Sequence, residues 1–243
     1  DYENNNYFLK GIFNKKNQPI EVLATFFDKK IGAENFYTTN PAWNEYEETQ
    51  NSLLGVSTTF RTEKFKISPR IYWRRGQDIF LLKRDDPSFF RNLHITNKVG
   101  VEANVSYTSE MGITGFGIDI SRFFISSNNL GNRNRTMANL FLEHRFTVWD
   151  NVDVTPGVAV TYFSDFKFNA FPGLDVGVQL TDNLKAYGNI GYTFRVPTFT
   201  DLYYKDPGTS GNPNLEPESA FAQELGIKFS TNNFSGSVAF FNR

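Results

Sequence analysis

Alternation of apolar and polar positions dominates the chain. In residues 184–195 the even positions, from Leu184 to Phe194, are apolar, whereas the odd positions, from Lys185 to Arg195, are mostly polar. Successive side chains of a β-strand point to opposite faces, so this segment predicts a strand with one apolar and one polar face. The alternation stops at Pro197, because proline lacks the N–H that a sheet ladder needs. Alternation resumes only near residue 221, so a long connection separates the two expected strands. An ordinary hairpin rarely has a connection of this length.

The same alternation recurs along the chain and predicts roughly twelve strands in six hairpins. We expect these strands near residues 7–15 and 20–28, 50–60 and 65–74, 97–107 and 113–124, 135–148 and 152–163, 171–180 and 184–195, and 221–230 and 234–243. Their inner turns are short, at residues 16–19, 61–64, 109–112, 149–151, 181–183 and 231–233, whereas the outer connections, such as 29–48, 126–131 and 198–215, are mostly longer. Outer-membrane barrels have short periplasmic turns and long extracellular loops. The chain is therefore expected to be all-β, a transmembrane antiparallel β-barrel.

The faces of the expected strands support a barrel. In residues 135–148, Leu140 and Leu142 lie on one face, and Glu143 and Arg145 lie on the other. A basic side chain on the lipid face costs about 2–4 kcal/mol at the membrane midplane. Glu143 and Arg145 are therefore expected to face the lumen.

Composition excludes several other classes of protein. Lys and Arg number 25 against 26 Asp and Glu, which gives no electrostatic case for a nucleic-acid partner. Aromatic residues make up 16% of the chain. A soluble protein seldom carries this much aromatic surface without a large core or a membrane interface to bury it. Cysteine is absent, and no apolar run reaches the roughly 20 residues of a transmembrane helix. The first six residues do not form a signal peptide, so we expect the chain to be an internal piece of a longer precursor.

Several motifs carry a resemblance to a known family. The segments FRVPTFTDLYY and GNPNLEPE, with ISPRIYWRRGQDIFLL, FLEHRFTV and FPGLDV, resemble TonB-dependent outer-membrane receptors, in particular the cobalamin-receptor branch of Bacteroidetes. The resemblance implies a 22-stranded barrel around an N-terminal plug. Residues 1–243 would then form a partial barrel domain, about 12 later strands without the plug. The terminal Arg243 departs from the aromatic residue with which such barrels end.

The resemblance also implies a function. It predicts a Gram-negative outer-membrane receptor that takes up a large, scarce ligand, with a corrinoid such as vitamin B12 favoured as cargo. The expected partners are the TonB–ExbB–ExbD energy-transducing complex, outer-membrane lipids and lipopolysaccharide, and a surface lipoprotein that caps the barrel. We expect no enzymatic activity and no cofactor. Two alternatives stay open: a receptor for a ferric siderophore, haem or a glycan, and a non-transporting barrel that acts as an enzyme or adhesin.

Two groups of residues are candidate ligand contacts. Trp73, Arg74 and Arg75 could hold an anionic or conjugated ligand through hydrogen bonds and stacking, or could instead form an interface tryptophan with charges that face water or lipopolysaccharide phosphates. In the loop at 198–215, tyrosines could supply flat contact area at a ligand mouth, or the loop could simply cover the rim. The candidates in this loop are Asp201, Tyr203, Tyr204 and Asn212.

Other chemistry finds little support. The acidic pairs Asp85-Asp86 and Glu47-Glu48 lack the spacing of a calcium loop, so calcium binding is not favoured. His94 and His144 have no nucleophile motif nearby, and no catalytic triad can be assembled from the spacing. We expect His144 near the lipid face and His94 near the outer end of its strand.

Overall fold

The computed structural model describes residues 1–15, 18–33, 43–206 and 208–243. It contains a single 13-stranded sheet and one short helix. Twelve strands follow one another in chain order across the sheet: β1 (Tyr2–Lys15), β2 (Gln18–Gly32), β3 (Tyr46–Thr58), β5 (Phe65–Leu81), β6 (Arg91–Ser109), β7 (Gly112–Ser127), β8 (Gly131–Val148), β9 (Val152–Phe163), β10 (Lys167–Thr181), β11 (Leu184–Arg195), β12 (Glu218–Ser230) and β13 (Ser235–Asn242). The short strand β4 (Phe60–Arg61) pairs with β5, and the helix α1 (Phe199–Tyr203) lies between β11 and β12.

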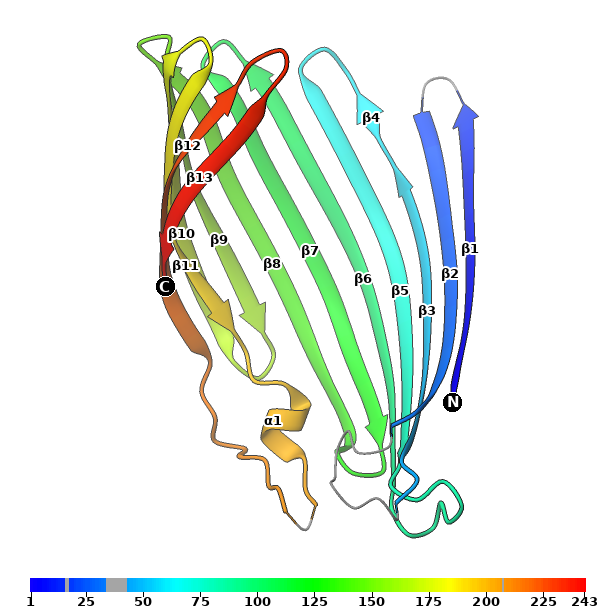
Figure 1. The fold of residues 1–243 in the computed structure, drawn as a ribbon. Coiled ribbons are helices and arrows are strands. Elements are labelled where there is room, and N and C mark those ends of the chain that lie inside the picture. Colours follow the sequence, from blue (N-terminus) through cyan, green and yellow to red (C-terminus); the bar gives the residue numbers. More distant parts are fainter. Residues whose placement is uncertain (16–17, 34–42, 207) are drawn as a thin grey trace.

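Every neighbouring pair of strands is antiparallel, and the connections differ at the two ends of the sheet. Figure 1 shows short turns at the top, whereas the bottom carries all the long connections and α1, together with the three-residue connections β7–β8 and β9–β10. This asymmetry confirms the expected all-β barrel architecture. We call the bottom of Figure 1 the loop end of the sheet.

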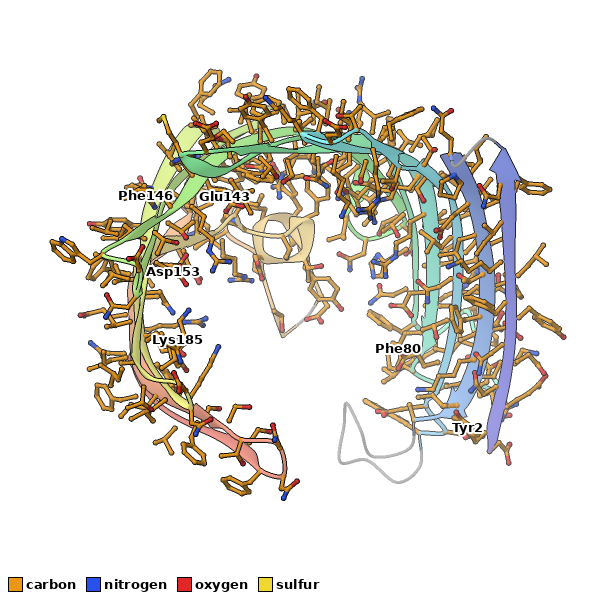
Figure 2. The ribbon with its side chains drawn as sticks, turned by 90° about the horizontal axis from the view of Figure 1, so that it is seen from above. Tyr2, Phe80, Glu143, Phe146, Asp153 and Lys185 are labelled. Atoms are coloured by element: carbon orange, nitrogen blue, oxygen red, sulfur yellow. The ribbon has the colours of Figure 1, made fainter. Side chains whose placement is uncertain are left out.

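The sheet curves into an open arc with a concave and a convex face (Figure 2). Glu143, Asp153 and Lys185 point into the arc, whereas Phe146 points away from it. Residues that are directly opposite each other on neighbouring strands share a face, and that face recurs at every second residue. The register therefore assigns each strand residue to a face. Glu143 lies on the concave side and Leu142 on the convex side, as the sequence pattern predicts.

The convex face is apolar and exposed. Large apolar side chains on this face, each more than a third exposed, include Leu54, Ile71, Val101, Ile120, Leu140, Leu142, Val158, Ile190, Leu225 and Phe240. Only five apolar residues are buried among the described residues, which is few for a chain of this size. Burial of apolar area in a core therefore contributes little, and such a convex surface needs lipid around it.

Most of the strands are longer than the sequence pattern predicts, whereas β9 and β11 match their expected bounds and β13 is two residues shorter. The strand expected at 50–60 begins at Tyr46 and ends at Thr58, the one expected at 65–74 continues to Leu81, and β12 begins at Glu218 rather than near 221. The expected tight turn at 16–19 is wrong in part, because Gln18 and Pro19 already belong to β2, and residues 16 and 17 lie outside the described part. Half of the expected loop at 126–131 is also strand, and only residues 128–130 connect β7 to β8. Among the described residues, no helix is long and apolar enough to cross a membrane.

Candidate functional site

The long connection between β11 and β12 folds back into the concavity at the loop end. Figure 2 shows α1 inside the arc, away from its own neighbouring strands. Phe199 on α1 is 8% exposed and packs with Ile125 of β7 and Leu130 of the β7–β8 turn, which are 8% and 2% exposed. The ring of Phe199 lies 5.9 Å from that of Phe123. This cluster is the main apolar core in the described part of the chain, and it fixes the connection against β7.

A capping box starts the short helix. The Thr198 hydroxyl accepts the Asp201 N–H at 3.1 Å, and the Asp201 carboxylate accepts the Thr198 N–H at 2.9 Å. Arg195 joins the carboxylate of Asp201, at 2.8 Å, to that of Glu218, at 3.1 Å. The hydrogen bond from the Thr198 backbone, with smaller support from Arg195, holds the pKa of Asp201 below its usual range. Asp201 is thus committed to the local fold of the loop.

Three side chains, two from strands and one from the β7–β8 turn, hold the connection in place. The Asn129 amide donates to the Lys205 carbonyl at 2.7 Å and accepts the Lys205 N–H at 3.1 Å. Arg135 Nη2 donates to the Pro197 carbonyl at 2.9 Å, and the same guanidinium pairs with Asp165 at 2.7 Å.

The third side chain, Asn92, is 7% exposed and donates its amide to the Tyr204 hydroxyl at 3.0 Å. Burial raises the pKa of that phenol. The connection is thus bonded to β6, to β8 and to the β7–β8 turn.

The remainder of the connection is shaped by turns. Asp206 Oδ1 accepts the N–H groups of Gly208 and Thr209, at 2.8 and 2.6 Å, and these bonds hold the pKa of Asp206 below its usual range. The Asn212 N–H donates to the Asp201 carbonyl at 2.9 Å, while its side chain accepts the Asn214 N–H at 3.0 Å. Asn212 therefore supports the loop through both its backbone and its side chain.

A cavity of about 550 Å³ lies between α1 and the concave face of β3, β5 and β6. Its polar lining includes Asp78, His94 and Arg135, and its apolar lining includes Phe123 and Phe199. Asp78 Oδ1 is buried and has no hydrogen-bond partner among the described residues. A volume of this size and a mixed lining are typical of small-molecule sites.

His94 takes a defined tautomer beside this cavity. Its Nδ1 lies 2.8 Å from the Ser127 hydroxyl, whose oxygen already accepts the N–H groups of Asn129 and Leu130 at 3.0 and 2.9 Å. The hydroxyl proton is therefore free to be donated to Nδ1, which leaves the ring proton on Nε2. His94 lies near the loop end of β6, where the sequence pattern places it.

The residues predicted as ligand contacts do not converge on one point. Tyr72 and Gly76 lie on the concave side by the register of β5 and β6. Arg74 is two residues from each of them, so it shares their face and points into the concavity. Trp73 and Arg75 therefore lie on the convex face, where the Trp73 indole donates to Asn97 at 3.1 Å.

The loop candidates lie together at the mouth of the concavity, about α1. Tyr203 stacks with the Arg133 guanidinium, 3.7 Å from the ring centroid, and Tyr204 is bound by Asn92. Whether any of these residues binds a ligand stays a prediction.

Sequence reasoning missed the side chains that hold and complete this site. Asn92, Asn129 and Arg135 lie about 60 to 110 residues from the loop segments they bind, too far for any local pattern to connect them. For Asp78 and His94 a signal was present, since they are luminal polar residues near the loop end of neighbouring strands and are directly opposite each other.

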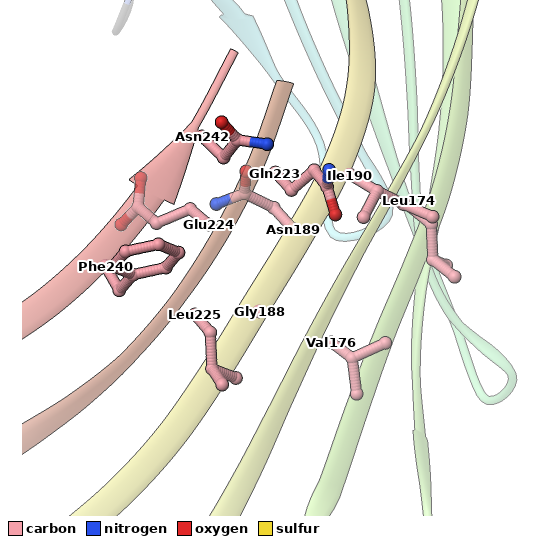
Figure 3. A pocket seen from close by; sticks show the side chains of 10 residues that line it. All are labelled: Leu174, Val176, Gly188, Asn189, Ile190, Gln223, Glu224, Leu225, Phe240 and Asn242. Atoms are coloured by element: carbon pink, nitrogen blue, oxygen red, sulfur yellow. The ribbon is translucent and has the colours of Figure 1, made fainter. Parts of the chain in front are cut away.

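A second hollow, of about 410 Å³, lies on the other side of the sheet (Figure 3). It is lined on the convex face of β10 to β13 by Val176, Ile190, Leu225 and Phe240, and Gly188 leaves it without a side chain at its floor. This hollow opens away from the concavity and is separate from the candidate site.

The concave face also carries a charged cluster nearer the short turns. The Asp153 carboxylate accepts from Lys185 at 2.7 Å, from Arg145 at 3.0 Å and from the Thr147 hydroxyl at 3.0 Å. Arg145 thus faces the lumen, as the sequence pattern predicts.

Among the residues that the structure describes, no group of three His, Cys, Asp or Glu side chains is placed to hold a metal ion.

Comparison with known proteins gives the family. The family described as TonB dependent receptor-like, beta-barrel matches residues 2–243. The chain belongs to this family of TonB-dependent receptors. Its members and structural neighbours are transport receptors rather than enzymes.

Individual relatives of this TonB-dependent receptor chain differ in the ligands that their names give. The vitamin B12 transporter BtuB of Vibrio vulnificus is 40% identical over 55 residues, 23% of this chain and 8% of that protein. The ferrienterobactin receptor of Escherichia coli is 22% identical over 240 residues, 86% of this chain and 31% of that protein. The siderophore receptor PirA of Pseudomonas aeruginosa superimposes with a TM-score of 0.83 at 14% identity, over 99% of this chain and 45% of its own. The chain thus spans less than half of each relative.

Proposed function

We propose that this chain forms part of the barrel of an outer-membrane receptor that binds a large, scarce ligand at its loop end and imports it. The observation that carries the proposal is the β11–β12 connection, which is bonded into the concavity and forms one wall of a cavity at the mouth. Receptors of this family lie in the outer membrane of Gram-negative bacteria and work with the TonB energy-transducing system. We expect TonB, ExbB and ExbD to act on a plug in the complete protein.

A corrinoid such as vitamin B12 is the favoured cargo. Support comes from the vitamin B12 transporters, which match a short stretch at about 40% identity, and from the motifs that resemble the Bacteroidetes branch. Arg74, Tyr203 and Tyr204 are the proposed contacts, because they lie on the concave face or at its mouth. The proposed binding of the corrinoid does not depend on calcium or on a surface lipoprotein.

A ferric siderophore is the second candidate. The ferrienterobactin receptor aligns over far more of the chain than the vitamin B12 transporters do, although at lower identity. The half-buried polar lining of the cavity, with Arg135 and His94, suits a charged chelate as well as a corrinoid.

Titration of the full-length receptor separates these cargoes. We expect cyanocobalamin to bind with nanomolar affinity and without turnover, and a ferric siderophore not to bind. Tyr203→Ala should weaken cyanocobalamin binding about tenfold, because a stacked aromatic contact contributes ~1 kcal/mol or more. Tyr192→Ala is the matched control, since Tyr192 is 52% exposed on the convex face. Siderophore binding without corrinoid binding would replace the cargo assignment and keep the receptor.

A further inference from the structure

Asp78 carries a hydrogen-bond acceptor without a donor at the loop end of the concavity. It lies on β5, and its directly opposite neighbours are Thr49 on β3 and His94 on β6. Asp78 Oδ1 is buried, and no residue that the structure describes donates a hydrogen bond to it. A buried oxygen of this kind has lost its hydration without a replacement, which costs free energy. A donor from a bound molecule would remove that cost.

His94 presents the complementary group beside this oxygen. Its Nδ1 lies 2.8 Å from the Ser127 hydroxyl and accepts from it, so the ring proton is on Nε2. Within the described ranges of the chain, this N–H has no acceptor. Side chains that are directly opposite on neighbouring strands have Cβ atoms about 5 Å apart. Asp78 and His94 thus offer one free acceptor and one free donor side by side.

The cavity in front of this pair has a specific charge and polarity. Asp78 and His94 both line the hollow of about 550 Å³ between the strands and α1. Arg135 also lines it, but its guanidinium lies 2.7 Å from the Asp165 carboxylate and is neutralised there. Among the described lining residues, Asp78 is therefore the charge without an ion pair. Much of the remaining lining is apolar and includes Leu130 and Phe199.

This pair discriminates among simple polar groups. An ammonium or guanidinium group could donate to Asp78 but would leave the Nε2–H of His94 without an acceptor. A carboxylate or phosphate could accept from His94 but would be repelled by Asp78 at short range. A primary carboxamide donates through its nitrogen and accepts through its oxygen, and both atoms are bonded to one carbon. It satisfies both residues while it stays neutral.

We propose that this cavity binds a neutral arm of the cargo that ends in a carboxamide. Asp78 accepts from the amide nitrogen, His94 donates to the amide oxygen, and the methylene groups of the arm lie against Leu130 and Phe199. The inference rests on the proposed receptor function and narrows its cargo, since corrinoids carry several acetamide and propionamide arms around the macrocycle. A whole corrinoid is too large for about 550 Å³, so one arm enters while the macrocycle stays at the mouth.

The first test titrates the full-length receptor at pH 7 with cyanocobalamin and with its monocarboxylic acids, in each of which one peripheral amide is hydrolysed. One of these acids should bind about tenfold more weakly than cyanocobalamin, because its carboxylate meets Asp78 and lacks the N–H. In Asp78→Asn this preference for amide over acid should fall about tenfold, since an asparagine amide can donate to the carboxylate. A purely structural role of Asp78 would change the affinity for both ligands equally and keep their ratio.

Asp175→Asn is the matched control, because Asp175 is an exposed carboxylate on the concave face of β10, outside the cavity lining. It should keep the full preference for amide over acid. Equal binding of cyanocobalamin and all its monocarboxylic acids by the unaltered receptor would overturn the proposal. So would an unchanged preference in Asp78→Asn. In both cases the binding of cyanocobalamin itself would leave the receptor function intact.

A second arm does not depend on the cargo. Propionamide, propionate and 1-propanol are added at millimolar concentration to the receptor with ¹⁵N-labelled histidine, and the His94 Nε2 resonance is assigned by its loss in His94→Gln. Propionamide should shift this resonance in the unaltered receptor, propionate should not, and Asp78→Asn should reduce the difference between them. An equal shift with 1-propanol, or no shift with propionamide, would overturn the carboxamide site. A shift with propionamide in a receptor that does not bind cyanocobalamin would keep the site and replace the corrinoid.

Discussion

Asp201 is the residue on which the start of the β11–β12 connection depends. Its carboxylate accepts the Thr198 N–H and pairs with Arg195, and its pKa in the folded chain is therefore below the ordinary value of 3.8. A depressed pKa means that this stabilisation is complete above pH 3.8 and is lost as the pH falls toward the folded value. We predict that amide exchange at residues 198–203, corrected for its intrinsic rate, is constant from pH 7 to about 4 and rises below that.

A neutral side chain at this position separates charge from geometry. Asp201→Asn should raise exchange at residues 198–203 already at pH 7 and remove its dependence on acid pH. Asp206→Asn is the control, because Asp206 closes a different turn through Gly208 and Thr209. Identical exchange in the Asp201→Asn and unaltered receptors at pH 7 would show that the carboxylate does not hold the loop.

Single residues also mark the limit of what the sequence could predict of the site. Alternation placed Glu143 and Arg145 on the luminal face correctly, because that face is defined by the chain's own period. The neighbouring Trp73, Arg74 and Arg75 were grouped as one candidate, although a strand must point Arg74 away from the other two. Asn129 and Arg135 gave no signal, since their partners Lys205 and Pro197 are about 60 to 80 residues away.

At the scale of the element, the β11–β12 connection closes on itself at Gly211. A Cβ atom there would lie 2.8 Å from Leu202 C and from Tyr203 N, both backbone atoms of α1 or its end. Gly211→Ala should therefore displace α1 and destabilise the docked connection by about 1–3 kcal/mol. Limited proteolysis of the folded receptor should show faster cleavage between residues 198 and 215. Gly208→Ala is the matched control, because its nearest contact would be Asp206 Oδ1 at 3.7 Å. Equal cleavage of the two variants would contradict this packing.

The strands show where pattern reasoning fails for elements. The expected strand at 50–60 begins four residues late, because Tyr46, Glu47 and Glu48 are polar or aromatic without alternation. They still form strand, since the ladder to β2 and β5 continues past the apolar belt. Backbone hydrogen bonds thus continue a strand beyond the residues whose side chains show apolar–polar alternation.

For the whole molecule, an added charge should be costly on the convex face of the sheet and tolerated on the concave face. Leu142 is 47% exposed on the convex face, so Leu142→Arg should cost about 2–4 kcal/mol against lipid. Thr155 lies on the concave face opposite Asp175, and Thr155→Arg should be nearly neutral. The fraction of receptor that assembles in outer membranes, measured by heat-modifiable mobility, should fall for the first variant alone. Similar losses for both variants would argue against lipid on the convex side.

The overall architecture could be predicted because the alternation and the turn lengths repeat over all six hairpins. Each hairpin carries the same information, so errors at individual ends did not change the fold. The relation of the loop to the strands could not be predicted in this way, since it is made once. It depends on Phe199, Ile125 and Leu130 meeting across the concavity.

The attachment of the connection also bears on how such proteins diversify. Asn129 and Arg135 bind backbone groups of Lys205 and Pro197, not their side chains. Substitutions at many loop positions can therefore accumulate while the segment stays attached to the strands through its backbone. A lineage under selection for a new nutrient could change the chemistry of the mouth without first rebuilding the barrel that carries it.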